Sequence, residues 1–188
     1  MKLVGKAGRR TLLRRYEAAA EAGDADAMLF LATIRAKDDP QTSRDWFRRA
    51  AEAGNVHAMY IVGLYLEPRS PEDSRAWLER AADAGHVDAM IKLGVLDQPR
   101  DPKAARSRYE QAAAAGSAIA MFNLGLLLER SDPESAIDWY EQAAAAGDAD
   151  AMVNLAKLHE DRDADTARAW WEKAAAAGHP DAHERLGA

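Results

Sequence analysis

The chain has 188 residues, a net charge of −6 and no cysteine, and 48% of its residues are apolar. The acidic balance argues against nucleic-acid binding, which needs a concentrated positive field, and the lack of cysteine excludes disulfides and thiolate metal sites. The basic segment 1–15 has no apolar core. We therefore expect neither a signal peptide nor a membrane span, and we expect the chain in the cytoplasm. The preference for arginine over lysine points to a bacterial source.

An Ala-Gly dipeptide recurs every 31 residues along the whole chain. Its glycines, numbered here as position zero of each unit, are Gly23, Gly54, Gly85, Gly116, Gly147 and Gly178. Alanine stands at −4, −3 and +4 in all six units, and a small residue stands at +9. A period of this length is typical of helical repeat proteins. The sequence thus predicts a repeat domain over residues 11–188, preceded by a basic extension, residues 1–10.

Each unit predicts two helices. An N-cap residue followed by proline, as at Asp39-Pro40 and Ser70-Pro71, starts a helix of about 13 residues that ends at the next glycine. That glycine fits the left-handed position after a helix end. A polar residue such as Asn55 then caps a helix from +2 to +12, which we call the first helix of the pair. His86 and His179 stand at the same cap position in two units and are poorer caps.

The residue columns carry a family resemblance. One unit reads Ala120-Met-Phe-Asn-Leu-Gly125, then Ala136-Ile-Asp-Trp139-Tyr140-Glu-Gln-Ala143-Ala144, then Gly147. This pattern resembles the Sel-one-like repeat, a relative of the tetratricopeptide repeat, and the resemblance covers about residues 11–187. The unit is shorter than the family norm, because the loop between the paired helices is trimmed. The resemblance implies a scaffold or adaptor that binds proteins, without identifying the partner.

The expected fold is therefore all-α: a right-handed α/α superhelical solenoid of antiparallel helix pairs, in six units of 31 residues. Small residues at −4, −3, +4 and +9 allow the helices to approach closely, and the large residues at −7, +5 and +8 fill the space between repeats. No unit buries its apolar face alone, so neighbouring units supply the other side.

A second stripe on the first helices, at +3, +6, +7, +10 and +13, points away from this core. It is apolar at +6 and in part at +10, where Leu64, Val95 and Leu126 stand, and acidic at its edges. Exposed apolar stripes with polar rims mark interaction sites. The candidate partner-binding residues are Leu29, Tyr60, Ile91, Lys92, Phe122, Asn123, Val153 and Asn154.

In tetratricopeptide-like arrays the first helices line the concave surface, so the resemblance places these residues in a groove. The amides of Asn123 and Asn154 are suited to an extended peptide, because a primary amide both donates and accepts hydrogen bonds. We expect a partner protein or peptide with apolar anchors and basic flanks. The alternative is that the +6 side chains pack against the adjacent repeat and the asparagines are solvated.

No catalytic or metal-binding pattern stands out. The carboxylates follow the repeat register, whereas a catalytic pair would occupy one special place. His179 and His183 are four residues apart, but His179 lies at a helix start, so we expect no metal, no cofactor and no enzymatic activity. The tryptophans at −8 are expected in the core. The remaining alternative is a structural protein that forms a homo-oligomer through its ends or its apolar stripe.

Overall fold

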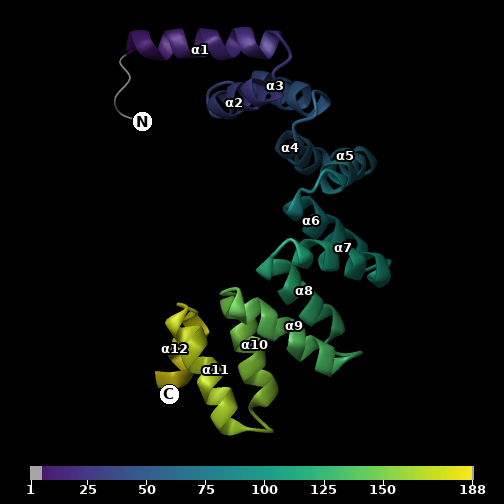
Figure 1. Cartoon of the computed structure of the whole chain (residues 1–188), viewed down its shortest axis with the longest axis vertical. Helices are drawn as coiled ribbons and strands as arrows, with labels where there is room; N and C mark the ends of the chain where they lie inside the picture. Colours follow the sequence, from purple (N-terminus) through teal and green to yellow (C-terminus); the bar gives the residue numbers. More distant parts are fainter. Residues whose placement is uncertain (1–5, 188) are drawn as a thin grey trace. The chain divides into compact units, whose positions relative to one another are not determined.

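The computed structural model describes residues 6–187. Within this range all regular secondary structure is helical, which confirms the predicted all-α fold of six antiparallel helix pairs (Figure 1). The helices are α1 Lys6–Glu21, α2 Ala25–Arg35, α3 Pro40–Glu52, α4 Val56–Leu66, α5 Pro71–Asp83, α6 Val87–Asp97, α7 Pro102–Ala114, α8 Ala118–Leu128, α9 Pro133–Ala145, α10 Ala149–His159, α11 Ala164–Ala176 and α12 Pro180–Gly187. None of the described helices is long and apolar enough to span a bilayer.

The helices pack into two compact units, Met1–Ala89 and Met90–Ala188. In the first, consecutive helices from α1 to α5 contact one another, and in the second the same holds from α7 to α12. α1 begins at Lys6, within the segment predicted as a basic extension. Residues 1–5 of that extension lie outside the described residues.

The helix boundaries follow the capping residues. Each repeat glycine has a positive φ, between 87° and 97°, as the predicted left-handed position requires. Asn55 accepts a hydrogen bond from the backbone N–H of Ala58 at 2.8 Å and so caps α4. Ser70 departs from the prediction: its hydroxyl donates to the carboxylate of Asp73 at 2.6 Å and accepts no hydrogen bond from the backbone N–H groups of α5.

Glycine at +9 and the large residue at −7 interlock the paired helices. A Cβ atom built on Gly125 of α8 would lie 2.5 Å from Cε1 of Tyr140 in α9, and one on Gly63 would lie 2.8 Å from Cγ of Leu78. Real side chains do not approach this closely, so the −7 residue fits only because +9 has no side chain. Leu78, Tyr109 and Tyr140 therefore each lie directly over a glycine of the preceding helix.

The −7 residue also reaches across to position +13 of the preceding first helix. The hydroxyl of Tyr140 donates to Glu129 at 2.9 Å, and the indole N–H of Trp171 donates to Glu160 at 3.1 Å. Burial, followed by the hydrogen bond to Glu129, raises the pKa of Tyr140 far above its usual value. These bonds satisfy the polar ends of aromatic side chains whose rings lie in the core.

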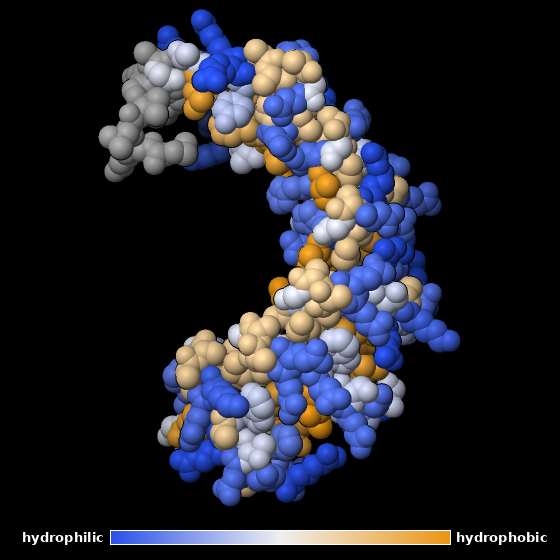
Figure 2. Space-filling model, viewed as in Figure 1, coloured by the Kyte–Doolittle hydropathy of each residue, from blue (hydrophilic) through white to orange (hydrophobic). Residues whose placement is uncertain are grey.

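The outward face of the second helices is solvated. In Figure 2 hydrophilic side chains cover the side of the second unit formed by α7 and α9. Arg106 pairs with Glu110 at 2.8 Å, one of three such pairs four residues apart. The tryptophans at −8 are half-buried rather than core residues. A cation covers three of them, as Lys173 does at 3.7 Å from the ring centre of Trp170.

Candidate functional site

The most exposed large apolar side chain of the described residues lies on α8. Ile119 is 56% exposed, and Leu126, seven residues further along the same helix, is 42% exposed. Asn123 lies between them at i+4 and is half-buried. Residues four and seven apart share one face of a helix, so these three form one surface, which we call the α8 surface. Val95 occupies the position of Leu126 in α6 and is 48% exposed.

The apolar residues predicted at +6 are less accessible. Leu29 and Ile91 are half-buried. Tyr60 stacks on His86, with ring centres 4.5 Å apart. The stripe at +6 therefore supports packing between consecutive repeats, which was the alternative interpretation of this column.

The +6 side chains of Phe122 and Val153, in the second unit, pack into its core. The ring of Phe122 lies 5.8 Å from that of Tyr140 and packs against the cluster that contains Leu155 of α10. Val153 is 3% exposed and belongs to the cluster around Trp171. Val153 thus offers no side-chain surface to a partner, whereas Phe122 keeps a partly exposed edge beside the α8 surface.

The polar residues predicted at +7, Lys92, Asn123 and Asn154, are half-buried. The amide of Asn154 forms a hydrogen bond with the hydroxyl of Tyr140. This bond lowers the pKa of the hydroxyl, whereas burial and Glu129 raise it. Asn154 is therefore engaged with its own chain. Asn123 is the asparagine that lies between exposed apolar residues.

The acidic edges of the stripe are also largely engaged within the chain. Asp26 accepts a hydrogen bond from Asn55 at 2.7 Å, and Asp150 contacts Nε2 of His179 at 3.0 Å. At +13, Glu160 accepts from both Trp171 and Arg185 at 3.1 Å. These carboxylates connect neighbouring repeats, and less of their charge is available to a partner than the sequence suggested.

His86 caps α6, although the sequence predicted a poor cap at this position. Its Nδ1 accepts a hydrogen bond from the backbone N–H of Ala89 at 3.3 Å, so the ring proton lies on Nε2, which donates to Nδ1 of His57 at 3.2 Å. Burial lowers the pKa of His86; the nearby Asp88 carboxylate opposes this shift and His57 adds to it. The neutral ring is the form that holds both contacts.

The helix pairs coincide with a known repeat. The Sel1 repeat model matches residues 25–55, 56–86, 87–117, 118–148 and 149–179, which together make up most of the chain. The chain belongs to the Sel1 repeat family. Proteins built from Sel1 repeats are generally protein-interaction scaffolds and are typically not enzymes.

Solved structures share the Sel1 fold. A protective antigen of uropathogenic Escherichia coli with an SLR fold is 28% identical, with a TM-score of 0.79 over 93% of this chain. The chain spans only 43% of that antigen. A Sel1 repeat protein from Oxalobacter formigenes is 25% identical, with a TM-score of 0.76 over 85% of this chain and 74% of its own.

A more distant likeness shows the fold alone. An immunity protein from Pseudomonas aeruginosa is 20% identical, with a TM-score of 0.55 over 85% of this chain and 67% of its own. No curated protein matches the chain.

Sequence reasoning missed Ile119, and it noted Val95 and Leu126 without choosing them as site residues. The signal for Ile119 lay in the repeat itself. At +3 the other Sel1 repeats of this chain carry aspartate or histidine, and only this one carries a large apolar residue. In other repeats the +3 residue bonds to the next repeat, as Asp26 does with Asn55, whereas the side chain of Ile119 can form no hydrogen bond.

Proposed function

We propose that the protein is an interaction scaffold whose first helices present the binding surface, on the side that the family resemblance describes as concave. The α8 surface is its centre in the second unit. The partner is a protein segment with apolar anchors for Ile119 and Leu126 and a backbone or polar group for Asn123. The observation that carries this proposal is the exposure of two large apolar side chains on one helix face.

Physical chemistry supports a polypeptide partner at this surface. Two exposed apolar side chains one above the other match the spacing of anchors on an extended segment or an amphipathic helix. The half-buried amide of Asn123 both donates and accepts, so it satisfies a backbone group that the partner would otherwise desolvate. Because the edge carboxylates are engaged within the chain, basic flanks on the partner are expected to add less than the apolar anchors.

A peptide library displayed without free carboxyl termini tests the proposal. Peptides selected on the wild-type protein are expected to lose roughly tenfold or more of their affinity for the double variant Ile119→Ser, Leu126→Ser, because both anchors lose their apolar contacts. The control is Leu12→Ser, which removes a similarly exposed leucine from α1 in the other unit. Affinities are measured by calorimetry, and circular dichroism checks the fold of each variant.

Two outcomes would contradict the proposal. In one, the selected peptides bind the double variant as they bind the wild type. In the other, the control variant reduces the affinity equally. Self-association is the alternative use of the same surface, and sedimentation velocity separates the two. A monomer that binds peptide supports the scaffold, whereas a dimer that the double variant dissociates supports the structural alternative.

A further inference from the structure

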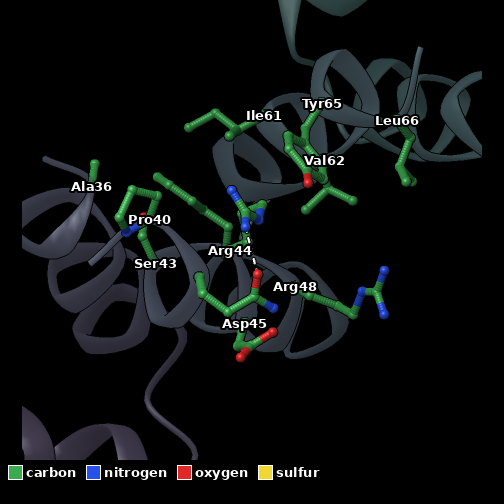
Figure 3. Close-up of a pocket in the computed structure, with 12 residues that line it drawn as sticks. Ala36, Pro40, Ser43, Arg44, Asp45, Arg48, Ile61, Val62, Tyr65 and Leu66 are labelled. Carbon is green, nitrogen blue, oxygen red and sulfur yellow. Dashed lines mark hydrogen bonds between the residues drawn. The ribbon is translucent and has the colours of Figure 1, made fainter. Parts of the chain in front are cut away.

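The first unit contains a pocket of about 360 Å³ between α3 and α4 (Figure 3). Ile61, Val62 and Leu66 of α4 and Phe47 of α3 form its apolar walls. Tyr65 stands at its edge and is 38% exposed. Its size falls in the lower range of known ligand pockets, so it suits one large side chain with a polar group attached.

At two positions that line the pocket, this repeat differs from the repeat that contains Tyr140. At the corresponding positions of the second unit, the hydroxyl of Tyr140 donates to the carboxylate of Glu129 at 2.9 Å. Here Phe47 stands at −7, without a hydroxyl, and Ala36 stands at +13, without a carboxylate. Both side chains are smaller than their counterparts in the Glu129–Tyr140 pair, and both line the pocket.

The charged residues beside the pocket also differ from those of the other repeats. In three repeats an arginine at −10 pairs with a glutamate at −6, as Arg106 does with Glu110 at 2.8 Å. In this repeat both positions are arginine, Arg44 and Arg48. No carboxylate of the described residues pairs with either of them. Arg44 instead bonds to Gln41 and lies over the ring of Tyr65, 5.3 Å from its centre.

The close-up view shows how these groups are arranged (Figure 3). Arg44 lies between the two helices, below Tyr65 and Ile61, and Arg48 extends from the next turn of α3 with its guanidinium group pointing away from Arg44. Asp45, the one carboxylate lining the pocket, points to the side of α3 away from α4. An apolar pocket thus has two guanidinium groups at its rim and no compensating acid between them.

We propose that this pocket binds the carboxyl terminus of a partner polypeptide whose last residue is large and apolar. The apolar walls take the side chain, and Arg44 and Arg48 take the carboxylate, since a guanidinium group matches a carboxylate with two parallel hydrogen bonds. The mouth of the pocket is open at Tyr65 and Arg48, both exposed. An open mouth leaves room for a chain to continue outward, which favours a polypeptide end over an enclosed small molecule. The site does not depend on the α8 surface.

Nuclear magnetic resonance titrations of the whole protein test the proposal with three probes. They are a tetrapeptide ending in leucine, the same peptide with an amidated terminus, and hexanoic acid. The free peptide is expected to shift the signals of α3 and α4 and the guanidinium signal of Arg44, and to bind roughly tenfold more tightly than the amide. Equal binding of peptide and amide would overturn the carboxylate role. Hexanoic acid binding as tightly as the peptide would overturn the assignment to a polypeptide.

The repeats supply variants that keep the fold. Arg48→Glu copies the residue found at −6 in the other five units and recreates the arginine–glutamate pair. The triple variant Ala32→Gly, Ala36→Glu, Phe47→Tyr copies Gly125, Glu129 and Tyr140, including the glycine that the tyrosine ring requires, and so fills the pocket. Each is expected to lose at least roughly tenfold in affinity for the free peptide, with an unchanged thermal midpoint.

The control is Arg130→Glu, which makes the same change of charge at an exposed site on the second unit. Unchanged binding to Arg48→Glu, or an equal loss in the control, would overturn the proposal.

Discussion

At the residue scale, Gly125 shows how one missing side chain sets the distance between paired helices. The ring of Tyr140 occupies the space where a Cβ atom would lie. Ala32 and Ala156 replace the glycine only in the repeats whose −7 residue is Phe47 or Trp171. The sequence therefore predicted a close approach at +9, but the partner that requires it became visible only in the structure.

Gly125→Ala is expected to lower the free energy of unfolding by about 1–3 kcal/mol, because the added methyl group forces the Tyr140 ring out of its position. Thermal and denaturant unfolding measure the effect. Gly187→Ala is the control, since nothing lies within 4 Å of a Cβ atom at that glycine. If the two variants unfold alike, the tight fit at Gly125 is wrong.

His86 is expected to make stability depend on pH. Its pKa in the folded chain lies below the ordinary value of 6.5, so the folded state favours the neutral ring. The stabilisation is complete above 6.5 and is lost as the pH falls from there through the lowered pKa of the folded state. The groups that face the ring are His57, which opposes protonation, and Asp88, which favours it.

Urea unfolding between neutral and mildly acidic pH measures this dependence. His86→Asn copies the cap of Asn55 and is expected to flatten the pH profile, whereas His183→Asn, at an exposed histidine, is expected to leave it unchanged. A wild-type slope that survives in His86→Asn would show that another group is responsible.

At the scale of the element, the helix boundaries were predictable because capping is local. Proline after aspartate, glycine at the helix end and a polar residue after it all act within a few residues. Burial on the outer stripe was not predictable in the same way. Val153 and Ile119 both belong to the stripe that was predicted to point away from the core. Val153 nevertheless lies in the cluster around Trp171, whereas Ile119 is the most exposed large apolar side chain of the described residues. That difference depends on the neighbouring repeat rather than on the helix itself.

Two caps that look alike in sequence are expected to differ in strength. Asn55→Ala removes the side chain that accepts from Ala58 and is expected to cost about 1 kcal/mol. Ser70→Ala is expected to cost much less, because the hydroxyl of Ser70 accepts no hydrogen bond from the backbone of α5. Equilibrium unfolding of both variants compares them, and a Ser70→Ala loss as large as that of Asn55→Ala would contradict the assigned caps.

At the scale of the whole molecule, the positions that are alike in every repeat specify the fold, and the positions that differ between repeats suggest where a partner binds. Positions that stack repeats hardly vary, because each neighbour requires the same shape. Ile119 and Arg48 stand where the other units carry a different class of side chain, and both lie at accessible surfaces. The sequence showed these differences. It did not show that Ala36 and Phe47 line the same pocket, which requires the packing of α2 to α4.

The location of a bound segment tests the scaffold proposal most directly. Methyl signals are recorded while the whole protein is titrated with a peptide selected from the library. The signals of Ile119 and Leu126 are predicted to shift in proportion to occupancy, and those of Leu12 and Leu186, which are similarly exposed elsewhere, are predicted to stay in place. Shifts at Leu12 or Leu186 with unmoved signals at Ile119 and Leu126 would contradict the assignment of the binding surface to α8.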